Sequence, residues 1–271
     1  MTTALLRPIA TPAERGWWAK AQAAARYEYL MQVRRPAVWL VVVGLIALRS
    51  SSPWPPELSA GITDHGTLVG DWAMNVMMLA PIGVGAMLAD RVRRESRLDL
   101  DDLLASTPTG IGPRLWGKAL GATAATITPV ALFWAALLAY LASGHGISVV
   151  PVGLEAFAAM ILPGLLFISA FSLTVPHLIG PPLYRLGLVG YWFWGNMVGP
   201  RYGIPTLAGT PFEAIGEYPG GAWFHAHMFD AADRGAHADT ANAILSIAFL
   251  LIAALVALGV THYVLNRRSP S

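Results

Sequence analysis

Six stretches of this 271-residue chain are rich enough in apolar residues to cross a lipid bilayer. A crossing helix needs about 20 residues, because the hydrocarbon core of a bilayer is about 30 Å thick. Only backbone that satisfies its own hydrogen bonds can enter this core, and a single apolar stretch does so as a helix. The predicted spans are 37–53, 72–89, 115–142, 151–179, 183–198 and 243–265. The sequence therefore predicts an all-α polytopic membrane protein with six transmembrane helices.

The composition agrees with this class. Hydrophobic residues make up 55% of the chain and charged residues 13%, whereas soluble proteins carry about 25% charged residues. The chain has no cysteine, which excludes disulfides and thiolate metal sites. No ionisable residue lies near the middle of a predicted span, although Glu155 and Arg185 lie close to span ends. An arginine near an end can reach the interface, so Arg185 is compatible with the short fifth span.

The N-terminal region 1–35 is predicted to be a cytoplasmic tail followed by an amphipathic surface helix. Residues 14–35 place Trp17, Ala21, Ala24 and Met31 along one stripe, which Glu28 interrupts. Aromatic and basic residues together favour a helix at the membrane surface. The alternative is a cytosolic helix that packs on protein.

The six-span transmembrane domain then covers 36–268, with Pro163 as a predicted kink.

The basic residues predict the orientation. Six of the 18 Lys and Arg residues precede the first span, six lie between the second and third spans, and Arg185, Arg267 and Arg268 fall on the same side. The other side has only Arg49, Arg201 and Arg234. Because cytoplasmic loops carry the excess of basic residues, both termini are expected in the cytoplasm of a multi-pass cell-membrane protein.

An acidic segment, 98–107, lies in the connection between the second and third spans. Asp99 can cap a short helix, and Leu100, Leu103 and Leu104 form an apolar stripe at helical spacing. Thr107-Pro108 would end this helix. Two turns are not stable alone, and an anionic leaflet repels aspartates, so the segment is predicted to dock on another protein. The alternative is a solvated loop.

Residues 112–119, with the sequence GPRLWGKA, differ at one position from the P-loop pattern that binds nucleotide phosphates. Ala119 stands where the hydroxyl residue belongs, no strand precedes the motif, and the next helix is a membrane span. Gly117 and Gly121, continued by Ala125, instead predict a surface for close helix packing. The chain therefore has no predicted nucleotide-binding domain.

These features together resemble the membrane subunit of type-2 ABC transporters. The matching residues are Arg93-Arg94-Glu95, the stretch from Leu103 to Pro108, and Gly117-Lys118. One departure is that Arg97-Leu98-Asp99 replaces the Gly-Thr pair that often precedes the coupling helix of this family. The resemblance covers nearly the whole chain and identifies 98–107 as a cytosolic coupling helix between spans two and three.

The resemblance implies a permease subunit of an ATP-driven transporter. The partners that it implies are a separate ABC ATPase and a second, identical or related permease. ATP and magnesium would bind the ATPase, and this chain would hold no cofactor, catalyse no reaction, contact membrane lipid and bind no nucleic acid. Export of a small or amphipathic molecule is implied by the family alone. The residues expected to dock the ATPase are Arg97, Asp99, Leu100, Asp101, Asp102, Leu103, Leu104, Thr107 and Pro108.

In related transporters the second and fifth spans often line the substrate path. The residues that this nominates are Asn75, Met77, Met78, Tyr191, Trp192, Trp194 and Asn196. The alternative for each is ordinary packing or contact with lipid. An interaction scaffold or sensory subunit that recruits a partner other than an ATPase remains the alternative for the whole chain, whereas no sequence motif of a membrane-embedded enzyme is present.

The largest predicted outer loop, 199–240, is rich in Gly and Pro and contains His225 and His227. Alternate histidines share a face only in a strand, and zinc needs further ligands. No metal site is predicted, and these two histidines are the only candidates for one.

Overall fold

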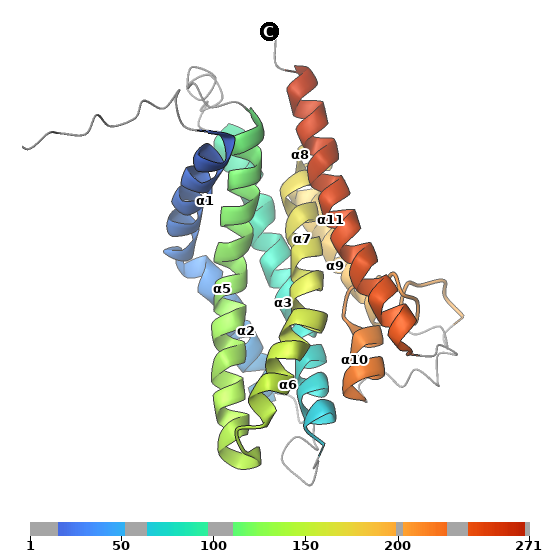
Figure 1. The fold of residues 1–271 in the computed structure, drawn as a ribbon. Helices are drawn as coiled ribbons and strands as arrows, with labels where there is room; N and C mark the ends of the chain where they lie inside the picture. Colours follow the sequence, from blue (N-terminus) through green and yellow to red (C-terminus); the bar gives the residue numbers. More distant parts are fainter. Residues whose placement is uncertain (1–15, 52–63, 97–110, 199–202, 227–237, 269–271) are drawn as a thin grey trace, which may run out of the picture.

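The computed structural model describes residues 16–51, 64–96, 111–198, 203–226 and 238–268. Within these ranges every regular element is a helix, and the helices form an elongated bundle (Figure 1). The predicted all-α class is therefore confirmed for the described part of the chain. The elements are α1 (Trp17–Val33), α2 (Pro36–Ser51), α3 (His65–Ser96), α5 (Ile111–His145), α6 (Val149–Ala156), the π-helical turn η2 (Phe157–Ile161), α7 (Leu162–Thr174), α8 (Pro176–Ile179), α9 (Pro181–Asn196), α10 (Glu217–Phe224) and α11 (Thr240–Arg268).

Four helical stretches are long and apolar enough to cross a membrane: His65–Ala89, Gly112–His145, Val149–Ile179 and Thr240–Val264. A fifth crossing arises if α1 and α2, which meet at a bend of 59°, are taken as one broken span. Helix α9 lies where the fifth span is predicted, but its 16 residues extend only about 24 Å. The described residues thus show a multi-pass helical protein with four candidate spans, or five with the bent pair.

The helices alternate in direction along the bundle (Figure 1). The beginning of α1, the end of α3, the beginning of α5 and the end of α11 gather at one end. We call this the basic end, because these helix termini carry Arg91, Arg114, Lys118 and Arg267. The opposite end, where α5 is followed by α6, is called the far end.

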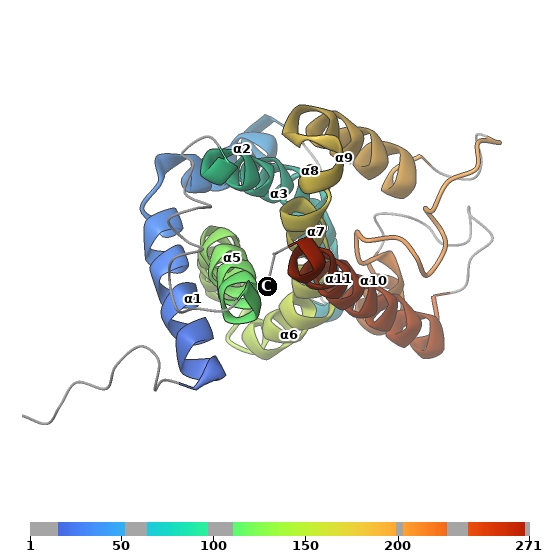
Figure 2. The same cartoon turned by 90° about the horizontal axis from the view of Figure 1, so that it is seen from above.

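Helices α3 and α7 form the centre of the bundle, as the view along its length shows (Figure 2). Met77, Val84 and Leu88 of α3 and Leu165 and Ile168 of α7 are all buried in the main apolar core. Helix α3 therefore contacts most of the other helices. A displacement of α3 would change the positions of these neighbouring helices.

The predicted kink at Pro163 coincides with a change of helix type. Proline has no N–H and its ring clashes with the carbonyl four residues earlier. The π-helical turn η2 lies directly before it, and the N–H of Leu162 bonds the Phe157 carbonyl, one residue farther back than in an α-helix. The extra residue in the turn accommodates the proline without ending the span.

Helix α11 is the most apolar span and also the least covered by protein, since only 22% of its most apolar window is buried. Ile252, Leu255, Val256 and Val260 project away from the bundle and are more than half exposed. Such a continuous apolar face is expected to contact lipid.

Candidate functional site

The segment predicted to dock an ATPase lies between helices α3 and α5. Residues 97–110, and with them all the predicted docking residues, lie outside the described part of the chain. The structure does describe both attachments of this segment, because α3 ends at Ser96 and α5 begins at Ile111. The candidate site is therefore the group of helices that holds these two attachments.

A buried ion pair connects α1 with the end of α3. The guanidinium of Arg91 contacts both carboxylate oxygens of Glu28, and each residue is only 5% exposed. Gln32, one turn farther along α1, donates a hydrogen bond to Glu28 Oε1 at 3.3 Å. The end of α3 is thereby fastened to α1 at Arg91, seven residues before the acidic segment 98–107 begins.

Glu28 is the residue that interrupts the predicted apolar stripe of α1. In the structure the buried residues of α1 are Ala21, Glu28 and Gln32, which lie seven and four residues apart and therefore share one helix face. A charged residue in an apolar stripe indicates an ionic partner, but the sequence does not distinguish Arg91 from the neighbouring arginines as that partner. Packing of α1 on protein corresponds to the alternative left open for this helix, and Trp18 and Tyr27 on the flanks of the buried face are exposed.

The second connection joins α1 to the beginning of α5. A methyl group added to Gly117 would collide with Ala21 O and lie 2.6 Å from Ala24 Cβ, and one added to Gly121 would collide with Ala25 O. The two backbones are therefore in direct contact. The predicted close-packing surface at Gly117 and Gly121 exists, and the helix that it receives is α1.

The residues nominated for a substrate path lie mainly where α3 meets α9. Met77, Trp192 and Asn196 are fully buried. The indole of Trp192 donates to the Met78 carbonyl at 3.0 Å, which joins the two helices directly. Asn75 is 4% exposed. The bond between Trp192 and Met78 is a helix-packing contact, which is the alternative that the sequence left open.

The two remaining nominated residues are more accessible. Tyr191 is half-buried and its ring lies 6.4 Å from that of Phe167, while Trp194 is 44% exposed. Both belong to α9, whose outer face also exposes Leu186 and Phe193. A path bounded by α9 would therefore lie on the outer face of this chain and need a second chain or lipid to close it.

The described part of the predicted outer loop folds back into the bundle. Asn196 at the end of α9 accepts a hydrogen bond from Ala214 N at 2.7 Å. Glu213 is completely buried, and its carboxylate accepts the backbone N–H groups of Ile215 and Glu217 at 3.0 and 2.6 Å. Glu213 therefore holds the beginning of α10, with Gly216 in a left-handed conformation at the N-cap.

The environment of Glu213 shifts its ionisation. Burial, followed by the nearby carboxylate of Glu217, raises the pKa of Glu213 from 4.5 to about 8, against the backbone hydrogen bonds that favour the charged form. Burial also raises the pKa of Tyr218. The sequence did not distinguish Glu213 from other acids of the loop, because its burial depends on contacts of α10 with distant helices.

Of the two candidate histidines, only His225 lies within the described residues. His225 ends α10, is exposed, and adopts a left-handed backbone with φ of 52°, while His227 lies outside the described residues. Within the described ranges, no three His, Asp or Glu side chains gather in a way that could hold a metal ion.

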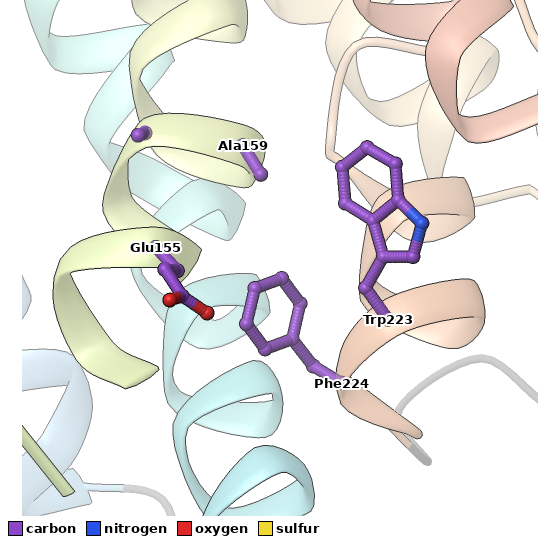
Figure 3. A pocket seen from close by; sticks show the side chains of 5 residues that line it. Glu155, Ala159, Trp223 and Phe224 are labelled. Atoms are coloured by element: carbon purple, nitrogen blue, oxygen red, sulfur yellow. The ribbon is translucent and has the colours of Figure 1, made fainter. Parts of the chain in front are cut away.

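A cleft opens between α10 and the π-helical turn toward the far end (Figure 3). It has a volume of about 440 Å³ and is lined by Glu155, Ala158, Ala159, Trp223 and Phe224. The carboxylate of Glu155 points toward the Phe224 ring, with Trp223 beyond it (Figure 3). The cleft thus combines one acidic group with two aromatic side chains.

Comparison of the chain with protein families, curated proteins and solved structures gives no match.

Proposed function

We propose that this chain is the permease subunit of an ATP-driven ABC transporter, an exporter of a small or amphipathic molecule. A separate ATPase, which binds ATP and magnesium, would act on the coupling segment 98–107. A second permease, identical or related, would pair with this chain. The proposal rests on the resemblance stated above and on how the attachments of the segment are built.

The observation that carries the proposal is the double fastening of α1. Its ion pair through Glu28 reaches the end of α3, and its backbone contacts reach Gly117 and Gly121 of α5. A force applied to residues 97–110 would therefore move three helices together instead of bending one helix end. Because α3 is central in the bundle, this movement would pass to α7 and α9.

Six crossings with both termini in the cytoplasm remain part of the proposal. Helix α8 lies at the basic end and α11 starts toward the far end (Figure 1), which supports a crossing by α9 together with the segment that follows it. The 16-residue length of α9 would then require local thinning of the bilayer or help from the loop that follows. The excess of basic residues at one end supports a cytoplasmic basic end.

Co-purification followed by an ATPase assay tests the proposal. The chain is purified in mild detergent from its native membrane, and co-purifying proteins are assayed for ATP hydrolysis. The variant Leu103→Asp plus Leu104→Asp should lose an associated ATPase, because it puts charge on the apolar docking stripe. The matched control Ala105→Asp adds charge to the opposite side of the predicted helix and should retain the ATPase.

Recovery of the chain alone, or with a partner that binds no nucleotide, would contradict the proposal. The second of these results would favour the scaffold or sensory role. Retention of the ATPase by the double variant would show that the leucine stripe is not the docking surface.

A further inference from the structure

We propose that the cleft between α10 and the π-helical turn binds an organic ammonium ion that carries apolar groups. The proposal concerns binding alone, and its failure would leave the transport function untouched. It stands on the position of Glu155, on the aromatic residues opposite, and on the backbone that shapes the cleft.

Glu155 is an ionisable side chain within the candidate span Val149–Ile179. Such residues are costly in a membrane protein and usually serve a site. Glu155 is exposed in the described structure, and among the described residues no ion pair or hydrogen bond to its carboxylate occurs. The charge is therefore available to a ligand in the cleft.

The opposite wall supplies two aromatic rings. Trp223 is 36% exposed and Phe224 is buried at 4%, and the Trp223 indole N–H is directed to Thr240 Oγ1 at 3.4 Å. Cations bind to the faces of aromatic rings, and tryptophan binds them most strongly. A carboxylate and an indole across one cleft therefore favour a positively charged group over a neutral or anionic one.

The backbone and the small side chains explain the shape of the cleft. Ala158 and Ala159 belong to the π-helical turn, a type of turn that occurs frequently at functional sites. Their methyl groups leave an apolar floor, which suits alkyl or aryl groups and offers no oxygen ligands for a small hydrated metal ion. The cleft thus selects an organic cation by charge and by apolar surface together.

Equilibrium dialysis of the purified chain with radiolabelled benzyltrimethylammonium tests this inference. The intact chain should bind the cation saturably and should not bind benzyl alcohol, which is neutral, with comparable affinity. Glu155→Gln and Trp223→Leu should each weaken binding at least fivefold. The matched controls are Asp239→Asn, which removes an exposed acid near the same end, and Trp18→Leu, which removes an exposed indole on α1; both should bind as the original chain does.

The natural ligand could be a free amine or the headgroup of a lipid such as phosphatidylcholine. Dialysis is therefore repeated in nanodiscs of phosphatidylcholine and of digalactosyldiacylglycerol, an uncharged lipid without an ammonium group, because an anionic lipid would itself concentrate the cation at the surface. Weaker cation binding in phosphatidylcholine would identify the headgroup as a competitor, and equal binding would show that the headgroup does not occupy the cleft and favour a soluble ligand; either result supports ammonium recognition. Unchanged binding by Glu155→Gln, or equal binding of benzyl alcohol, would overturn the proposal.

Discussion

The ion pair between Glu28 and Arg91 shows how a single buried contact can organise one end of a membrane protein. Two charges removed from water gain little from each other beyond their desolvation, but either one left alone in the interior is strongly unfavourable. Both residues are 5% exposed here. The pair therefore fixes the position of α1 relative to α3 more than it adds to overall stability.

Removal of one partner is expected to be more harmful than removal of both. Glu28→Met or Arg91→Met alone should lower the free energy of unfolding by about 3–5 kcal/mol, because each leaves an uncompensated buried charge. The double variant Glu28→Met plus Arg91→Met should recover most of this loss. Thermal unfolding of the four proteins in detergent forms the complete cycle, and additive losses would mean that the two residues do not interact.

Glu213 predicts a dependence of stability on pH. The folded state keeps its proton up to about pH 8, whereas an ordinary glutamate has a pKa of 4.5. Between these values the folded chain holds more protons than the unfolded chain, so the stabilising contribution is fully present below about pH 4.5 and is lost as the pH rises through about 8.

The variant Glu213→Gln should remove this loss, because an amide does not ionise. Its single oxygen can replace one of the two carboxylate oxygens that accept the N–H groups of Ile215 and Glu217, so the variant is expected to be less stable at low pH. Melting temperatures measured from pH 5 to pH 9 should therefore fall less steeply for the variant than for the original chain. Asp239→Asn, at an exposed position, should follow the original curve. Parallel curves for all three proteins would refute a buried protonated carboxyl at position 213.

At the scale of elements, the contact between α1 and α5 depends on the absence of side chains. Gly117 and Gly121 face the backbone of α1, whereas Gly144 in the same helix has no heavy atom of another segment within 4 Å of an added Cβ. In helix α5, close packing therefore requires glycine at positions 117 and 121 but not at position 144.

Gly121→Ala should separate α1 from α5 and lower the free energy of unfolding by about 1–3 kcal/mol, as overpacking of a close contact does. Gly144→Ala, the matched control, should be neutral or stabilising by up to about 1 kcal/mol, since alanine is the better helix former. Thermal unfolding in detergent compares the two variants. Equal behaviour would show that α1 does not pack closely at Gly121.

At the scale of the molecule, the alternating helix directions make orientation testable. The chain has no cysteine, so single cysteines can be labelled without background. Ile147 and Leu178 are 79% and 76% exposed; Ile147 lies in the connection after α5 at the far end, and Leu178 lies in the short helix α8 at the basic end. Ile204, 49% exposed, follows α9.

A maleimide that cannot cross membranes should label Ile147→Cys and Ile204→Cys on intact cells. Leu178→Cys should react only after the cells are permeabilised, because its end of the bundle is predicted to be cytoplasmic. Labelling of Leu178→Cys and Ile204→Cys from the same side would mean that α9 does not cross. Reversed labelling of all three would refute the predicted orientation.

The sequence alone determined the helical class, the positions of the apolar helices and the clustering of basic residues. These are properties of neighbouring residues, since hydropathy over about 20 residues and the helical period require no knowledge of distant segments. The same local reading found the packing glycines Gly117 and Gly121. It also predicted the shortness of the fifth span, since 183–198 and α9 are both 16 residues long.

Only the tertiary structure decided which distant residues meet. Glu28 and Arg91 are 63 positions apart, and Glu155 faces Trp223 and Phe224 from another helix. The burial of Glu213 likewise depends on helices far away in the sequence. Such contacts follow from how helices pack against each other, and periodicity along a single helix states which face is buried but not what it is buried against.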